Sequence, residues 1–203
     1  MNINKIRETI DGLDKKIVAL LNKRARKILE IGRIKNRFKK SIYAPAREKE
    51  ILTKIASGNK GPLTSASLEA IYREVMSASL ALEKSIVIAY LGPQATFTHL
   101  AALKKFGASV DYLPCASITD VFSEVEKDNA DYGVVPIENS IEGAVSHTLD
   151  MLMDSDLKIC SQIMLDISHN LLAQCAKKDI KKIYSNPQVF GQCRLWLETN
   201  LPK

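Results

Sequence analysis

The 203-residue chain is long enough for one or two domains with a hydrophobic core, and its 46% hydrophobic content is that of a globular protein. The net charge of +6 is uneven: residues 1–84 hold 19 Lys and Arg against 9 Asp and Glu, whereas residues 85–203 hold 10 against 14. No run of eighteen apolar residues and no N-terminal signal pattern occur, which argues against membrane association and secretion. We therefore expect a cytoplasmic protein with a basic and an acidic unit.

The cysteines and histidines do not predict metal chemistry. Four cysteines, at positions 115, 160, 175 and 193, form no CxxC pair, and the three histidines lack the spacing of metal ligands. We expect reduced thiols that are mostly buried, no metal site and no cofactor.

The first predicted helix is unusually long. From Ile3 to Phe38, apolar residues recur at intervals of three and four, and the only interruptions are Gly12 and Gly32, which cost about 1 kcal/mol each relative to alanine. Such a helix has about 35 residues and a length of about 50 Å. Because this exceeds the diameter of a small domain, we expect a second copy of the chain to cover its apolar face.

Three cations lie on or beside this apolar face. Arg24 occupies a position where an apolar residue is due, and Lys35, eleven residues later, returns to within about 20° of the same direction. Arg7 lies about 25 Å from Arg24 along the helix. An unpaired buried cation costs several kcal/mol, so either an anion meets these groups or their long side chains reach solvent from the edge of the face.

Two further helices complete the basic unit. One is predicted from Pro45 to Gly58, and the next begins at a cap formed by Thr64 or Ser65. Both helices direct polar residues to their apolar sides, namely Glu48, Ser79 and Glu83. Polar groups from three helices favour a pocket for a small polyanion over a purely structural ion network, and the inward cations and few aromatic residues argue against nucleic acid.

At Ser85 the pattern changes to alternating strands and helices. A continuous apolar run at 86–91 predicts a buried parallel strand, and the elements after it are typical of a mostly parallel α/β unit. We predict a helix from Thr96 or Thr98 to Phe106, a strand near 110–113, a helix near 118–127, a strand at 132–135 and a helix near 144–153. Asn186 and Pro187 predict another helix start.

Polar residues follow the strand predicted at 132–135, just before a helix. Glu138, Asn139, Ser140 and Glu142 occupy the position at which parallel α/β sheets bind ligands, although ordinary turn chemistry also explains such a string.

Residues 3–84 resemble the all-helical chorismate mutase family through Arg7, Arg24, Lys35, Glu48, Ser79 and Glu83. The resemblance implies an intertwined homodimer with two sites, each of which borrows Arg7 from the partner. Arg7 and Arg24 would bind the two carboxylates of chorismate, and Ser79 would assist.

The same resemblance assigns the remaining residues. Glu48 would accept a hydrogen bond from the ring hydroxyl, and Lys35 and Glu83 would flank the ether oxygen, where negative charge grows as the bond breaks. Two positions depart from the family pattern. Ala44 stands where an acidic residue is common, and Glu83 stands where some members have glutamine.

From about residue 86 the chain resembles prephenate dehydratase, most specifically in the string from Glu138 to Gly143. This implies a two-lobed fold like that of periplasmic binding proteins, with prephenate in a cleft lined by the polar residues above and flanked by Thr96 and Thr98. The Gln94-Ala95 pair departs from the usual Glu-Gly, and the family's Thr-Arg-Phe motif is absent.

The sequence therefore predicts two domains: a chorismate mutase domain at 1–84 and an incomplete prephenate dehydratase domain at 85–203, both serving phenylalanine biosynthesis through the shikimate pathway. The expected ligands are chorismate and prephenate, with no nucleic-acid or membrane partner. A non-catalytic dimeric module that senses a ligand through its α/β unit is the alternative.

Overall fold

The computed structural model describes residues 2–38, 44–139 and 143–201. Three helices form the first part of the chain: α1 (Ile3–Arg37), α2 (Pro45–Gly58) and α3 (Ser65–Glu83). Helix α3 packs against both of the others. Asn2 caps α1 and Thr64 caps α3 through side-chain oxygens that accept backbone N–H groups, and Pro45 occupies the first turn of α2. The predicted bounds of α2 and the predicted starts of α1 and α3 are confirmed, and α1 ends one residue before the predicted Phe38.

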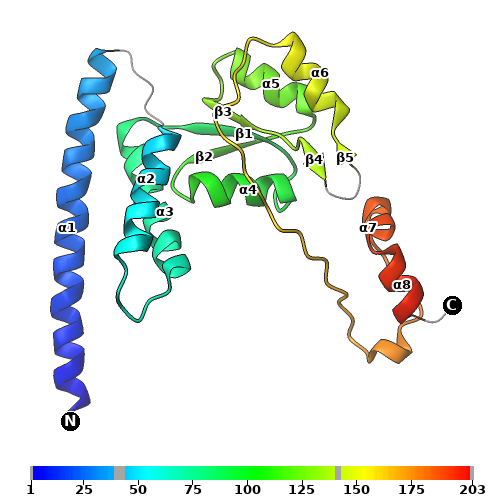
Figure 1. Ribbon diagram of the computed structural model, residues 1–203, viewed down its shortest axis with the longest axis horizontal. Helices are drawn as coiled ribbons and strands as arrows, with labels where there is room; N and C mark the ends of the chain where they lie inside the picture. Colours follow the sequence, from blue (N-terminus) through cyan, green and yellow to red (C-terminus); the bar gives the residue numbers. More distant parts are fainter. Residues whose placement is uncertain (1, 39–43, 140–142, 202–203) are drawn as a thin grey trace.

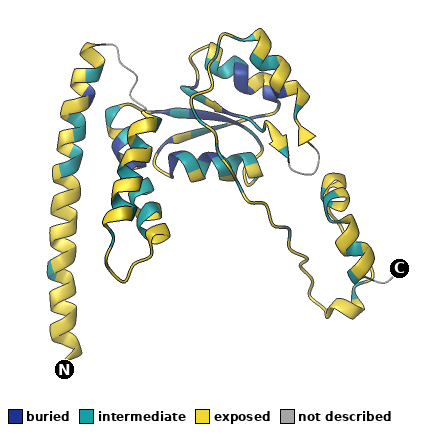
Figure 2. Cartoon of the chain, in the orientation of Figure 1, coloured by how far each residue is buried: buried dark blue, intermediate teal, exposed yellow. Residues whose placement is uncertain are grey.

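Helix α1 extends well beyond the other two helices (Figure 1). Its 35 residues include a single buried residue, Gly32, close to the C-terminal end that contacts α3. Most of its other residues are exposed in this single chain, and the half-buried ones lie mainly in the C-terminal half, Arg24 and Lys35 among them (Figure 2). The apolar face that the periodicity predicts is therefore present and uncovered.

The second part is built on a parallel three-stranded sheet. Its strands are β1 (Val87–Leu91), β2 (Asp111–Cys115) and β3 (Tyr132–Val134), in the order β2-β1-β3. Helix α4 (Phe97–Phe106) covers one face, where Ile88 and Tyr90 pack, and α5 (Ile118–Glu126) covers the other, where Ala89 packs. The predicted buried strand is thus the central one, apolar toward both helical layers.

After β3 the structure differs from the predicted polar loop. A short antiparallel pair, β4 (Glu138–Asn139) and β5 (Gly143–Ala144), intervenes before α6 (Ser146–Asp154). The pair holds Glu138 opposite Ala144. Sequence patterning misses strands of two residues because alternation is not detectable over so short a run.

Beyond α6 the chain runs from 155 to 176 without helix or strand, crosses the front of α4, and reaches a distant pair of helices (Figure 1). These are α7 (Pro187–Gln192), capped by Asn186 as predicted, and α8 (Arg194–Asn200), after the 3-10 turn η1 (Lys177–Asp179). None of the described helices combines the length and apolarity that crossing a bilayer requires.

Helix α3 also joins the two parts. The backbone N–H groups of Ala108 and Ser109, just after α4, donate to Glu74 Oε2 and Ser77 Oγ of α3, each at 3.0 Å. Between them and α4 lies Gly107, with φ +75° and ψ −170°, a conformation that is essentially restricted to glycine. A Cβ at Gly107 would lie 2.5 Å from Ser77 Cβ. The junction therefore requires glycine at position 107, both because of its backbone conformation and because a side chain there would overlap Ser77.

Gly107→Ala is expected to lower the free energy of unfolding by about 2 kcal/mol or more, because backbone strain and overlap with Ser77 add together. Gly143→Ala is the matched control, since Gly143 has φ +81° but a Cβ added there would meet nothing within 4 Å. Chemical denaturation should show the larger loss for Gly107→Ala. Equal losses would mean that the junction absorbs the overlap at no cost.

Candidate functional site

The contact between α1 and α3 contains a polar cluster. Arg24 Nη1 of α1 donates to Ser79 Oγ of α3 and lies 3.5 Å from the carbonyl oxygen of Val75. Ser79 is 7% exposed, and its hydroxyl donates to the same carbonyl at 2.6 Å. The arginine that replaces an apolar residue in the α1 pattern therefore points to α3, where polar groups receive it.

A second pair lies along the same contact. Lys35 Nζ is 3.6 Å from Glu83 Oε2, and the exposed fractions of these side chains are 22% and 5%. This separation is an ion pair but is too long for a hydrogen bond. Glu83 Oε2 is buried and has no hydrogen-bond partner among the described residues. A buried carboxyl oxygen in this state is costly unless a further group meets it.

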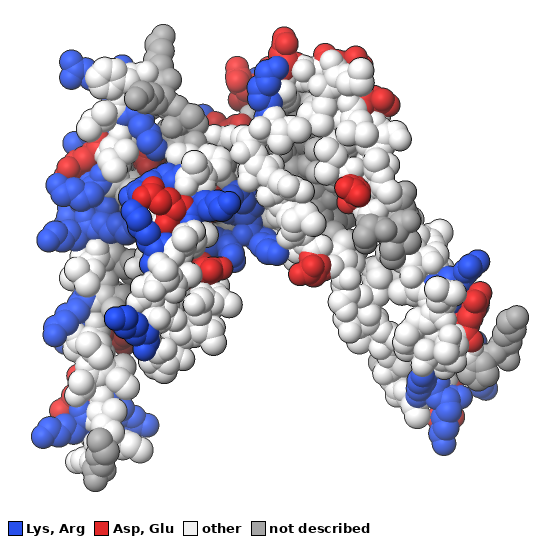
Figure 3. All heavy atoms as spheres, viewed as in Figure 1, with Lys and Arg blue, Asp and Glu red and all other residues white. Residues whose placement is uncertain are grey.

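The two pairs converge on a small region of α3. Arg24 and Lys35 are eleven residues apart, or about 16 Å along α1, but Ser79 and Glu83 are one turn apart, about 6 Å along α3. The long side chains of Arg24 and Lys35 thus extend toward Ser79 and Glu83, which are close enough for one small molecule to contact both. Basic side chains are also concentrated over α1 and α2 in the surface view (Figure 3).

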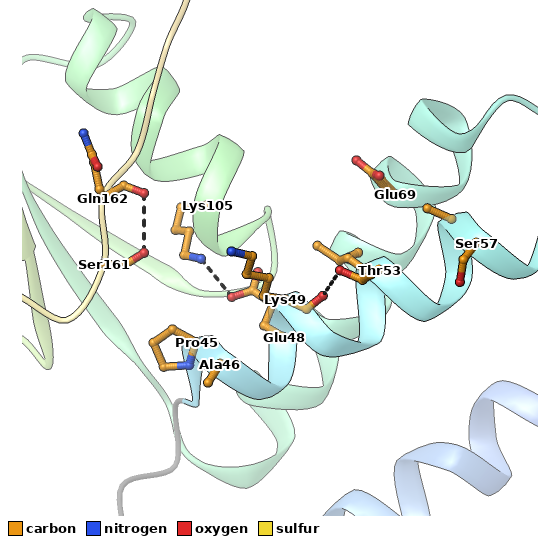
Figure 4. A pocket seen from close by; sticks show the side chains of 12 residues that line it. Pro45, Ala46, Glu48, Lys49, Thr53, Ser57, Glu69, Lys105, Ser161 and Gln162 are labelled. Atoms are coloured by element: carbon orange, nitrogen blue, oxygen red, sulfur yellow. Dashed lines mark hydrogen bonds and ion pairs between the residues drawn. The ribbon is translucent and has the colours of Figure 1, made fainter.

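Glu48 of α2 has a partner that the sequence did not predict. Its Oε2 lies 3.0 Å from Lys105 Nζ in the last turn of α4, and the two side chains are 14% and 20% exposed. Both side chains line a hollow of about 740 Å³ together with Ser161 and Gln162. Figure 4 shows Lys105 and Glu48 pointing toward one another there. The α/β unit therefore contributes a cation to the helical unit.

Arg7 lies apart from these groups. It is exposed on α1 and makes no hydrogen bond or ion pair with any described residue. Around it, the apolar residues of α1 are at least 40% exposed: Ile3, Ile6, Ile10, Leu13, Ile17, Val18, Leu20 and Leu21. Within one chain, the structure does not bring Arg7 to the cluster.

The predicted dehydratase residues fall into three groups. Thr96 caps α4: its Oγ1 accepts from His99 N and donates to the carbonyl oxygens of Leu91 and Pro93. Thr98, Glu138 and Asn139 line one broad hollow beside the extended segment. Ser140 and Glu142 lie outside the described residues.

Cys115 and Tyr90 are buried in the core of the sheet. Burial raises the pKa of the Cys115 thiol and of the Tyr90 hydroxyl, so both stay protonated near neutral pH. Tyr90 stacks on His99, with ring centroids 4.7 Å apart. Among the described residues, no group of three or more His, Cys, Asp or Glu could hold a metal ion.

Comparison with known proteins identifies both parts of the chain. Residues 88–203, more than half of the chain, match the prephenate dehydratase family. The chain belongs to the prephenate dehydratase family. In this member the dehydratase region is preceded by residues 6–84, which match chorismate mutase type II.

Relatives of this prephenate dehydratase family member are named for both activities. A bifunctional chorismate mutase/prephenate dehydratase from Aquifex aeolicus is 49% identical over 98% of the chain, and one from Escherichia coli K12 is 30% identical over 95%. The chain spans 57% and 55% of their lengths. A solved chorismate mutase (form II) from Thermus thermophilus, 33% identical, covers 40% of this chain and 92% of its own, with a TM-score of 0.40.

Sequence reasoning missed two residues in this family member. No pattern in the sequence singled out Lys105, and only the position of α4 beside α2 directs it to Glu48. Gly32 looked like a cost to helix stability, yet it is buried against Glu83. No one-dimensional pattern reports a contact between helices whose packing is not yet known.

Lys105→Ala should lower the free energy of unfolding by about 1–3 kcal/mol, because Glu48 would be left largely buried without this partner. Lys54→Ala is the control: Lys54 pairs with Glu50 in a far more exposed ion pair, so its removal should change stability little. Urea denaturation of both variants tests this. A similar effect for both would show that the contact between α2 and α4 does not contribute.

Proposed function

We propose that residues 1–84 convert chorismate to prephenate and that residues 85–203 belong to a unit that dehydrates and decarboxylates prephenate, two steps of phenylalanine biosynthesis. The observation that carries the first part is the polar cluster between α1 and α3. It combines two cations with a buried carboxyl oxygen that lacks a hydrogen bond among the described residues. The matches to chorismate mutase type II and prephenate dehydratase support both parts.

Chorismate fits this cluster chemically because it carries two carboxylates and an ether oxygen. Arg24, with Ser79 beside it, would bind one carboxylate by charge-assisted hydrogen bonds. Lys35 would donate to the ether oxygen, and Glu83 in its neutral form would be a second donor there. The rearrangement is unimolecular, so the protein's contribution is to hold the reactive conformer and to stabilise charge on the departing oxygen.

Glu48 would accept a hydrogen bond from the ring hydroxyl of chorismate. Its ion pair with Lys105 supports this role, because it fixes the orientation of the carboxylate from outside the helical unit. With Ala44 in place of an acidic residue, no second carboxylate stands at that position before α2 to share the hydroxyl.

The second carboxylate requires a cation that one chain does not bring to the cluster, and we propose that the partner subunit's Arg7 supplies it. In an antiparallel α1 pair centred near residue 15 or 16, residue n lies beside about residue 31 − n, which places Arg7 beside Arg24. The same register sets Ile10 opposite Leu21. These are residues of the exposed apolar face, so one dimer would bury the face and complete the site.

For the α/β unit we propose a ligand cleft with Thr98, Glu138 and Asn139 at its edge. The hollow that these three residues line supports this placement. Thr96 would act by capping α4, since its hydroxyl is already engaged. A second lobe like that of periplasmic binding proteins remains part of the proposal. The cysteines, which are all free, favour a reducing compartment such as the cytoplasm.

A chorismate assay decides between this proposal and a non-catalytic dimeric sensing module. The purified chain should consume chorismate, and Arg24→Ala and Lys35→Ala should each lower kcat/KM by about two orders of magnitude or more, because each removes charge stabilisation from a partly buried site. Lys27→Ala is a control on the same helix, since Lys27 pairs with Glu30 at the surface. Absence of chorismate consumption by the unaltered chain would favour the sensing module.

Arg7→Ala and Arg24→Ala proteins, each inactive alone, should regain activity when mixed and allowed to exchange subunits, because one of the two sites in a mixed dimer contains both arginines. About a quarter of the unaltered activity is the upper limit for random exchange, since half of the dimers are mixed and each has one intact site. Light scattering should report a dimer for both variants. Exchange without recovery would contradict the shared site, and a monomeric mass would contradict the dimer.

A further inference from the structure

Gly32 occupies an unfavourable place for a glycine. It lies within α1, where glycine costs about 1 kcal/mol relative to alanine, and its backbone is not in the positive-φ region that would justify it. Helix stability alone therefore favours alanine at this position, and the reason for glycine must come from its surroundings.

Those surroundings are the side chain of Glu83. A Cβ at position 32 would lie 3.1 Å from Glu83 Cγ, 3.4 Å from Oε2 and 3.6 Å from Cβ. Carbon atoms in contact are ordinarily about 3.5–4.0 Å apart, so Glu83 would have to move by several tenths of an ångström. The three nearest atoms outside its own helix and neighbours all belong to Glu83, so the tightest constraint at this position comes from that side chain.

A displacement of Glu83 would change its position relative to Lys35. Residues 32 and 35 are neighbours on one side of α1, so the clearance at Gly32 and the ammonium of Lys35 meet the same carboxyl group. The Glu83 side chain is 5% exposed, and its Oε2 lacks a hydrogen bond to any described residue that could hold it elsewhere. The backbone of α1 at Gly32 thus forms the wall against which Glu83 rests.

We propose that Gly32 is a positioning residue for the mutase reaction: the absence of a side chain there allows Glu83 to approach α1 and to present its carboxyl group beside Lys35. This inference rests on the proposed function, in which both groups flank the ether oxygen of chorismate. Misplacement of a reacting group by about 1 Å or less is enough to slow a reaction that depends on orientation.

Gly32→Ala should lower kcat tenfold to a hundredfold and leave KM within about threefold, because Arg24 and Ser79, which bind the carboxylate, do not contact position 32. Gly12→Ala is the matched control. It makes the same change in the same helix, has nothing within 4 Å, and lies more than about 100° around α1 from the apolar face. Its kcat and KM should equal those of the unaltered chain.

The Glu83→Ala background separates a positioning role from a general effect on the fold. There the Cγ and Oε2 atoms that Gly32→Ala displaces are gone, so adding Gly32→Ala should change kcat less than about twofold. The double variant should also melt at a higher temperature than Gly32→Ala alone, a readout that holds even if the single variant folds poorly. Circular dichroism provides the melting curves.

The outcomes are distinct. An active unaltered chain with Gly32→Ala equal to Gly12→Ala would overturn the positioning role and leave the proposed function intact. An equal loss from Gly32→Ala with and without Glu83 would also overturn it, because the effect would not pass through that carboxyl group. An unaltered chain that does not consume chorismate would overturn the proposed function and this inference together.

Discussion

The contact of α1 with α3 is the constraint on which the rest of the helical unit depends. It takes two long basic side chains away from water, and such groups are tolerated only where polar partners receive them. Ser79 and Glu83 are those partners, one turn apart on α3. Their spacing makes the cluster small, and the Oε2 atom of Glu83 has no hydrogen bond within the described residues. The packing of α1 on α3 and the placement of the charged groups of the cluster thus depend on the same helix contact.

Helix α3 has a second function in the architecture, because it also holds the α/β unit. Glu74 and Ser77 accept the two backbone N–H groups that follow α4, and Leu80 packs on the core of the sheet. The close approach at Gly107 makes this junction a direct contact of the two units. Since α4 then lies near α2, Lys105 reaches Glu48. A substitution that shifts α4 at the junction would therefore be expected to affect two parts of the proposed mutase site. It would disturb α3 directly, and it would disturb Glu48 on α2 through Lys105.

The apolar face of α1, in contrast, has no covering element within the described part of one chain. Apolar residues from Ile3 to Leu21 are exposed to an extent that folded monomers rarely show over so long a stretch. The proposed antiparallel pairing would bury this face and bring a cation from each subunit to the site of the other. Assembly and catalysis would then have the same physical origin, and the stability of the dimer would be inseparable from the completeness of the site.

The sequence by itself determined the elements. The spacing of apolar residues predicted α1 within a residue at each end, caps and prolines marked the starts of α2, α3 and α7, and the continuous apolar run predicted β1 as a buried strand. These signals are local, because helix periodicity and capping depend on residues within a few positions of each other. The direction of Arg24 and Lys35 toward the inner side of α1 was predictable for the same reason. Only the tertiary structure decided which groups meet: that Glu48 pairs with Lys105 from the other unit, and that Gly32 provides clearance for Glu83. Contacts between elements far apart in the chain depend on how helices pack, and the packing is a property of all the side chains at once rather than of any one segment.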